Sequence, residues 1–196
     1  MKTLYVVSHT EATHHLDNVV GGWHDSELTE KGLADARLIA ERLPKDVQIE
    51  TIYSSSLKRA LSTAKEISKT TGAKVLASDN LREMCFGAAE GKHQSWLNDR
   101  ICPEDGINRL DHRIVEGAET KREFAGRIYA YLDNVEWGDV SVLSTHSFAA
   151  TFVLAWWIRM PLEAVGYVNF NITPGKISKL VEDDFFRNRA VEYINR

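Results

Sequence analysis

Two apolar runs of strand length, each followed closely by a histidine, constrain the fold of this chain more than any other feature. Residues 3–7 read TLYVV and precede Ser8 and His9, and residues 140–145 read VSVLST and precede His146. Short apolar runs rich in valine are typical of strands that are buried on both faces of a sheet. We therefore expect two interior strands with a histidine at the carboxyl end of each.

Segments with helical spacing separate these strands from further strand-like segments. Apolar residues recur at helical spacing in residues 33–43, 60–67 and 124–135, and residues 148–158 are apolar enough for a mostly buried helix. Thr29 is expected to cap the first helix and Gly72 to end the second. Further strands are predicted at residues 50–56 and 73–77, and a terminal hairpin at residues 167–172 and 176–181, with the turn residues TPG between them.

Strands joined by helical crossovers predict a parallel sheet with helices on both faces. We therefore expect an α/β fold, a three-layer α/β/α arrangement with a mostly parallel sheet. The chain has 196 residues, which is the size of one domain, so residues 1–196 are predicted to form a single domain. Residues 91–115 interrupt the alternation with polar residues, Trp96 and Pro103, and are predicted to be a small cap insertion over a site.

Composition narrows the class of protein. No apolar run approaches the roughly 20 residues that a membrane span needs, and the first residues, MKTLYVV, lack the features of a signal peptide. Cys85 and Cys102 show no disulfide or metal-ligand spacing, and the formal net charge of −4 argues against a nucleic-acid binder. A soluble cytoplasmic protein with no membrane or nucleic-acid partner is expected.

Four chemically capable side chains are predicted to meet at one edge of the sheet, because ligands bind outside the carboxyl ends of parallel strands. His9 and His146 suit phosphoryl transfer: a neutral imidazole can attack phosphorus, and a protonated one stabilises the oxygens. Arg59, which follows the second strand, can hold phosphate oxygens with its guanidinium fork. Glu83, which follows the third strand, is placed to give a proton to a leaving alkoxide.

Five motifs occur in an order and spacing that resemble a known family. They are SHTEATHHLDNVVGGWHDSELTEKG, YSSSLKRALSTA, LREMCFGAAEG, EGAET and VLSTHSFAA, within about residues 3–154. This pattern is similar to that of the histidine phosphatase superfamily, in its phosphoglycerate-mutase-like branch. The resemblance implies that His9 is the phosphorylated nucleophile, His146 the second histidine of the phosphate pocket, Arg59 a phosphate-binding arginine and Glu83 the proton donor. It also implies that no metal or organic cofactor is needed.

Several positions in the phosphate pocket depart from the family pattern. Ser8 replaces the arginine before the nucleophile, Thr10 the glycine after it, Ala12 a threonine, His15 an asparagine, Val19 a second arginine, and Ser147 the glycine after His146. Two cationic groups are therefore missing, and a charge-assisted hydrogen bond from one such group is worth roughly 1.5–3 kcal/mol. We expect Ser8, Thr10, His15 and Ser147 to contact the substrate in their place.

Other side chains are candidates to restore positive charge. They are His14, His15 and His24 in the altered loop, and Lys92, Arg109 and Arg113 in the predicted cap. For each, a solvated side chain is the alternative. His15 has the strongest claim because it stands where the family has a phosphate ligand.

Three functions remain open from the sequence. The leading one is a phosphomonoester hydrolase that acts on a small phosphorylated metabolite through a phosphohistidine. The second is a catalytically weak or silent relative that binds an anionic ligand as a sensor or scaffold, an alternative motivated by Ser8. The third is a metal site, because imidazoles and carboxylates crowd residues 9–25 and suit zinc or iron. The predicted hairpin, with Tyr167 and Phe170, is a candidate surface for a homodimer.

Overall fold

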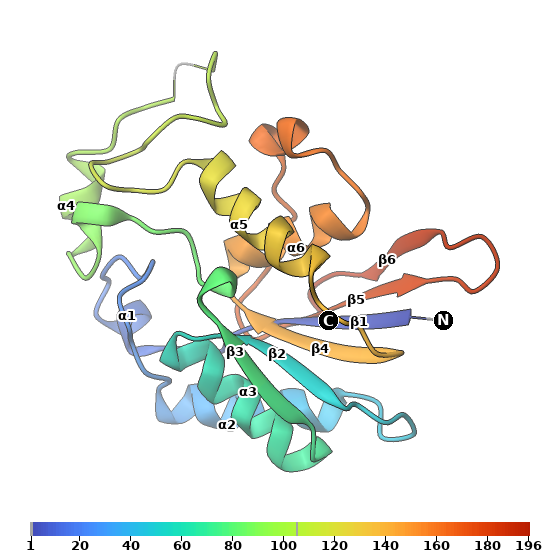
Figure 1. Ribbon diagram of the computed structural model, residues 1–196. Coiled ribbons are helices and arrows are strands. Elements are labelled where there is room, and N and C mark those ends of the chain that lie inside the picture. The colour runs from blue at the N-terminus through green and yellow to red at the C-terminus, as the bar shows by residue number, and fades with distance from the viewer. Residues whose placement is uncertain (1, 105) are drawn as a thin grey trace.

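The chain folds around one six-stranded sheet that lies between two layers of helices (Figure 1). The structure is a computed structural model, and it describes residues 2–104 and 106–196. The strand order is β3-β2-β4-β1-β5-β6. This arrangement is the three-layer α/β/α fold expected from the sequence, so that prediction is confirmed.

Most of the strands and longer helices lie close to their predicted positions, whereas the strand at residues 189–193 and the short helices at residues 13–16 and 94–98 were not predicted. The strands are β1 (Lys2–Ser8), β2 (Thr51–Ser55), β3 (Lys74–Ser78), β4 (Val140–Thr145), β5 (Ile177–Glu182) and β6 (Arg189–Tyr193). The helices are α1 (Thr13–Leu16), α2 (Glu30–Arg42), α3 (Lys58–Thr71), α4 (Gln94–Asn98), α5 (Lys121–Asp133) and α6 (Ser147–Trp157). Short 3₁₀ helices are η1 (Asp79–Leu81), η2 (Gly87–Ala89) and η3 (Leu162–Tyr167).

The pairing of strands brings the two strand-end histidines together. Strands β1 and β4 are parallel neighbours, and Ser8 pairs with Thr145 at their carboxyl ends. The next residue of each strand is His9 and His146 respectively, so both histidines leave the sheet side by side. Strand β2 is parallel to β4 on its other side, and β3 is parallel to β2. The carboxyl ends of four strands therefore share one edge of the sheet.

Side chains of the central strands alternate between the two helix layers. On β1, Leu4 and Val6 pack with α5 and α6, whereas Tyr5 and Val7 pack with α2 and α3. Strand β4 alternates in the same way, with Leu143 on the first side and Val142 on the second. Because both faces are covered, the strands read as nearly continuous apolar runs in the sequence.

Helix ends follow the capping signals in the sequence. The Thr29 hydroxyl accepts a hydrogen bond from Gly32 N and begins α2, as predicted. Gly72 ends α3 in the left-handed conformation, at φ 72°. Thr120 and Glu123 form a reciprocal capping box at the start of α5.

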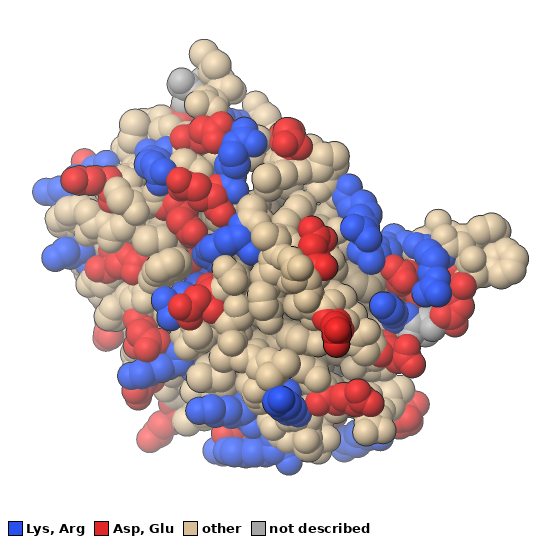
Figure 2. Space-filling model, in the orientation of Figure 1, with Lys and Arg blue, Asp and Glu red and all other residues tan. Residues whose placement is uncertain are grey.

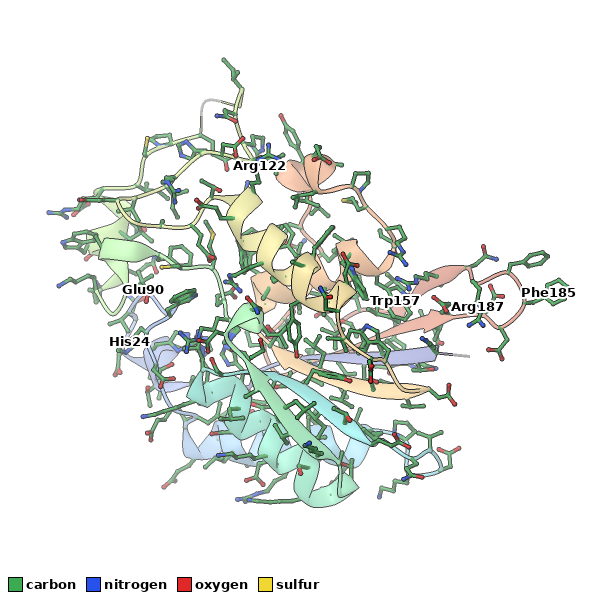
Figure 3. The ribbon with its side chains drawn as sticks, in the orientation of Figure 1. His24, Glu90, Arg122, Trp157, Phe185 and Arg187 are labelled. Carbon is green, nitrogen blue, oxygen red and sulfur yellow. The ribbon has the colours of Figure 1, made fainter. Side chains whose placement is uncertain are left out.

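The predicted terminal hairpin is wrong in position. Residues 167–172 form no strand, because Phe170 N bonds the Thr151 hydroxyl and Asn171 has a φ of 51°, which breaks an extended conformation. The hairpin lies one segment later, where β5 pairs with β1 and with β6 in antiparallel fashion. Its tip projects from the body of the molecule with Phe185 at its end (Figure 3). Tyr167 and Phe170, suggested as a homodimer surface, therefore do not lie on a hairpin. The homodimer itself stays a prediction.

Residues 91–115 contain α4 and then an irregular segment. Leu97 and Val115 pack with Val20 in a small apolar cluster. The guanidinium carbon of Arg100, Cζ, lies 4.5 Å from the centroid of the Trp96 ring. Asp105 lies outside the described residues. The assignment of this segment as a cap, and of residues 1–196 as one domain, stays a prediction.

Charged side chains of both signs are interspersed on the face of the molecule that Figure 2 shows. Many of them are paired, as Arg122 is with Asp111 and Arg189 with Glu182. Within residues 2–104 and 106–196, no helix combines the length and the apolar character that crossing a membrane would require.

Gly32 gives the first stability prediction, because α2 touches the loop after His9 at this residue. A Cβ placed on Gly32 would lie 2.0 Å from Glu11 O. Glu11 O is a backbone atom that no side-chain rotation can move aside, so Gly32→Ala forces the loop and the helix apart. We expect the free energy of unfolding, measured in urea, to fall by about 1–3 kcal/mol.

Gly126→Ala in α5 is the matched control. A Cβ there meets only Leu162 Cδ2, at 3.9 Å, an ordinary contact. Alanine is the better helix former, so this variant should gain about 0.5–1 kcal/mol. Equal effects of the two substitutions would contradict the close approach at Gly32.

Candidate active site

His9 leaves the carboxyl end of β1 as a buried, neutral imidazole. Its Nδ1 lies 2.7 Å from Thr10 O, and a carbonyl accepts only from a protonated nitrogen, which leaves the lone pair on Nε2. Burial, followed by the nearby Arg59 charge, holds the pKa of His9 well below its ordinary value. The unprotonated Nε2 is chemically suited to nucleophilic attack, and the role of His9 as the nucleophile stays a prediction.

Arg59 is a buried cation in the first turn of α3. Its Nε donates to His9 Nε2 at 3.2 Å, Nη1 donates to His24 O at 2.7 Å, and Nη2 donates to Gly22 O at 2.6 Å. Burial lowers its pKa to about 10, so it stays charged at neutral pH. The guanidinium thus joins the loop at residues 22–24 to the nucleophile.

His146 lies behind His9 at the end of β4. The two ring centroids are 5.0 Å apart and the rings are nearly perpendicular. His146 Nε2 is 2.8 Å from the Ser55 hydroxyl, whereas His146 Nδ1 is buried and has no hydrogen-bond partner among the described residues. Burial, followed by the charge of Arg59, lowers the pKa of His146 well below its ordinary value. A buried nitrogen left unpaired is costly, and a ligand in the site would relieve that cost.

Glu83 places its carboxyl group at the N-terminus of α6. Oε1 accepts from Met84 N at 3.0 Å and from Ala149 N at 3.1 Å, and Oε2 accepts from Phe148 N at 3.1 Å. Burial raises the pKa of Glu83, partly offset by these three amides and by Arg59. A carboxyl group whose pKa is raised is suited to carry a proton that it can donate.

These side chains surround one cavity of about 220 Å³. Its lining residues are His9, His14, His15, Gly21, Gly22, Arg59, Glu83, Phe86, Ser147, Phe148 and Pro174. The structure thus brings together the four residues predicted as catalytic: three line the cavity, and His146 contacts His9 from behind. The sequence did not single out five of the lining residues: Gly21, Gly22, Phe86, Phe148 and Pro174.

Two more imidazoles stand beside the nucleophile. His15 is stacked on His9 with centroids 5.7 Å apart, and His14 lies 4.0 Å from His15. His15 Nδ1 accepts from Ala12 N at 3.1 Å, which leaves the proton on Nε2 when the ring is neutral. Burial lowers the pKa of both rings, in the case of His14 to about 3.

Gly21 makes room for His14. A Cβ at Gly21 would lie 2.8 Å from His14 Cδ2, and Gly22 has a positive φ of 39°. The pair Gly21-Gly22 in VVGGW was thus a signal for close backbone packing at the site.

Ser8 and Ser147 replace family residues at positions that touch each other. Their hydroxyl oxygens are 3.0 Å apart, with Ser8 fully buried and Ser147 on the cavity wall. Thr10 donates its hydroxyl to Gly32 O at 2.7 Å and lines a neighbouring groove between α2 and residues 173–176, which shares His15 and Pro174 with the cavity. That Ser8, Thr10, His15 and Ser147 bind substrate stays a prediction.

The cations of the predicted cap have other partners. Arg109 pairs with Glu104 at 2.8 Å and donates to Gly166 O at 3.1 Å. Arg113 bonds Ala118 O and pairs with Glu123. Neither they nor Lys92 is among the described residues that line the cavity.

His24 contributes its carbonyl to Arg59, while its ring lies toward Gly91 on the side of the site where Figure 3 labels His24 and Glu90. Glu90 Oε1 accepts from Trp23 N and Phe86 N, both at 2.9 Å, and so joins two loops that flank the cavity.

One of the carboxylates considered as a metal ligand binds a backbone amide. Asp25 Oδ1 accepts from Lys58 N at 2.8 Å, at the start of α3. In the part of the chain that the structure describes, no group of three or more histidine, cysteine, aspartate or glutamate residues is arranged to hold a metal ion.

The sequence matches a family model over nearly its whole length. The model describes the "Histidine phosphatase superfamily (branch 1)" and matches residues 4–191. A relative in Hydrogenobacter thermophilus named "Putative phosphoserine phosphatase 2" is 34% identical over 139 residues, which cover 69% of this chain and 68% of the relative. A relative in Enterobacter named "Probable phosphoglycerate mutase GpmB" is 30% identical, over 84% of this chain and 78% of its own.

Solved structures share the fold. The alpha-ribazole phosphatase from Shigella flexneri superposes with a TM-score of 0.80 at 22% identity, covering 99% of this chain and 96% of that one. A mycobacterial glucosyl-3-phosphoglycerate phosphatase, solved with VO3, superposes with a TM-score of 0.81 at 22% identity, covering 100% and 99%.

The depressed pKa of His14 gives a prediction for stability against pH. The folded-state pKa, about 3, lies below the ordinary 6.5. Below 6.5 the unfolded chain binds a proton that the folded chain does not, so stability is lost as the pH falls from 6.5 toward 3. His14→Gln should reduce the loss between about pH 7.5 and pH 5, measured by urea unfolding, by about 1–2 kcal/mol. An equal loss in the variant and the wild type would contradict the assignment.

Proposed function

Because the chain belongs to the histidine phosphatase superfamily, we propose that it hydrolyses a small phosphomonoester through a phosphohistidine formed at His9. The observation that carries the proposal is the presence of an unprotonated His9 Nε2 and of the buried Glu83 carboxyl group, whose pKa is raised by burial, on the walls of one cavity. The phosphatases and mutases named among the similar proteins agree with this class of chemistry.

In the first step, His9 Nε2 attacks phosphorus and the ester P–O bond breaks. The leaving oxygen takes the proton of Glu83, so an alcohol departs and the carboxyl group becomes a carboxylate. Two amides bind Oε1 and one binds Oε2, which favours Oε2 as the oxygen that carries the proton.

In the second step, a water molecule attacks the phosphohistidine. The carboxylate of Glu83 takes a proton from that water, the N–P bond breaks and inorganic phosphate leaves. His9 recovers its lone pair and Glu83 its proton, so the cycle closes with no net change in the protein.

In this proposal Arg59 supplies most of the positive charge that stabilises the phosphoryl oxygens. His146 Nδ1, which has no partner in the described residues, is a candidate ligand for one oxygen when protonated. His15 lies beside His9 and is a candidate for another.

A second function is favoured by one observation. Arg59 directs all three of its nitrogens to protein acceptors, and Ser8 stands where the family has an arginine. A relative that binds an anion without turnover fits these two facts. For either function we propose a cytoplasmic location and a small phosphorylated ligand, and a homodimer stays open.

His9→Ala tests the leading function. Without the nucleophile, turnover of 4-nitrophenyl phosphate should fall by at least about 10³-fold. Phosphate trapped on the wild-type protein, after an alkaline quench that spares phosphohistidine, should be absent from the variant. His112→Ala is the control, because His112 contacts Cys102 O outside the cavity.

The same assay separates the alternatives. Turnover that resists a chelator supports the phosphohistidine route, and turnover abolished by the chelator would indicate a metal enzyme. If no monoester reacts while vanadate or phosphate raises the melting temperature, the silent relative is correct. Full activity of the His9→Ala variant would contradict the proposed mechanism.

Ser8 and Ser147 give a gain-of-function prediction. Their hydroxyls are in contact, so an arginine at position 8 needs the space that Ser147 fills. The double variant Ser8→Arg/Ser147→Gly should raise kcat/KM for 4-nitrophenyl phosphate by about 10–100-fold, the value of a charge-assisted hydrogen bond. Ser8→Arg alone should gain less. If both variants lose activity, the pocket has been rebuilt around another ligand.

A further inference from the structure

A second cavity adjoins the catalytic one. It has a volume of about 390 Å³ and is lined by Ser147, Phe148, Asn169, Asn171 and Ile172. Ser147 and Phe148 also line the catalytic cavity, so the two spaces share one wall.

The proton donor lies at this shared wall. Glu83 accepts hydrogen bonds from the backbone of Phe148 and of Ala149. In an in-line displacement the leaving oxygen departs on the side of phosphorus opposite the attacking His9. It must also reach Glu83 for its proton, so the rest of the leaving group extends along Phe148 into the second cavity.

This cavity offers no positive charge. Among the residues that the structure describes, Arg59 is the only lysine or arginine on the walls of either cavity. The two cations behind the adjacent loop already have protein partners. Arg109 and Lys121 both pair with Glu104, and both donate a hydrogen bond to Gly166 O. A carboxylate or second phosphate on the leaving group would therefore find no cationic partner on these walls.

The polar groups that remain are neutral amides on a fixed loop. Asn169 Oδ1 accepts from Asn171 N at 2.8 Å. Asn195 holds the same loop twice, because its Nδ2 donates to Asn171 O and its Oδ1 accepts from Thr173 N, each at 2.8 Å. In the described part of the chain the side-chain amide of Asn171 has no hydrogen-bond partner, so it offers a donor and an acceptor to a ligand.

We propose that, given the phosphatase activity proposed above, this second cavity binds the leaving group. It selects phosphomonoesters whose leaving group is uncharged, with an aromatic or apolar face against Phe148 and Ile172 and a hydrogen-bonding edge toward Asn171. Esters whose leaving group carries a carboxylate or a second phosphate are poor substrates.

The test compares four alkyl esters: benzyl phosphate, glycerol 1-phosphate, O-phosphoserine and 3-phosphoglycerate. Since all four leaving groups are alcohols, differences report the cavity more than the intrinsic reactivity. We expect kcat/KM for benzyl phosphate to exceed that for 3-phosphoglycerate by at least about tenfold, the order of one charged contact. Equal or reversed values would overturn the proposal.

A variant that installs a cation sharpens the test. Asn169→Lys should raise the ratio of kcat/KM for 3-phosphoglycerate to kcat/KM for benzyl phosphate about tenfold. Asn169→Ala controls for the lost hydrogen bond to Asn171 N, and Asn134→Lys, at the far end of α5, controls for added charge. A gain for 3-phosphoglycerate in Asn134→Lys as large as in Asn169→Lys would refute the assignment of the cavity.

Binding separates this proposal from the phosphatase reaction itself. Benzylphosphonate and 3-phosphonopropanoate are not hydrolysed, and their dissociation constants are measured by calorimetry. If no ester is turned over, the phosphatase proposal fails, yet tighter binding of benzylphosphonate by about tenfold still supports the cavity assignment. Equal affinities, or preference for the carboxylate, would overturn it whether or not the protein is a phosphatase.

Discussion

The buried guanidinium of Arg59 is the interaction on which the site depends. It sits in the first turn of α3 and binds the carbonyls of Gly22 and His24 as well as His9 Nε2. An uncompensated buried cation would be costly, so the chain must bring two loop carbonyls and an imidazole lone pair to it. That requirement determines the path of residues 21–24 beside the cavity and the face of His9 that is turned toward the cavity.

The protonation of the four imidazoles at the site depends on burial and on one permanently charged neighbour, Arg59. Burial, with the charge of Arg59 contributing at each, lowers the pKa of His9, His14, His15 and His146 and so favours their neutral forms. An anion near these rings favours their protonated forms. The charge of the pocket thus depends on its occupant, whereas a pocket built from arginines carries its charge permanently.

Most of the fold was predictable because local signals agreed with tertiary packing. The runs at β1 and β4 are buried on both faces, and Thr29 and Gly72 cap helices as their residue types suggest. The convergence of His9, Arg59, Glu83 and His146 followed from strand ends. The hairpin was misplaced because residues 167–172 have strand-forming residue types, yet Asn171 adopts a positive φ. The second cavity was not predictable, since the approach of the loop at residues 169–172 to the start of α6 depends on tertiary packing that no local signal indicates.

The Asn195 contacts have a consequence for the order in which the site is completed. His9 is synthesised early, but the loop at residues 171–173 is held by a side chain near the other end of the sequence. The two contacts join residues that are 22 and 24 positions apart, so each closes a short loop at a modest cost in entropy once Asn195 is present. On the ribosome, the loop beside the second cavity therefore gains these contacts only after Asn195 has been made, long after His9.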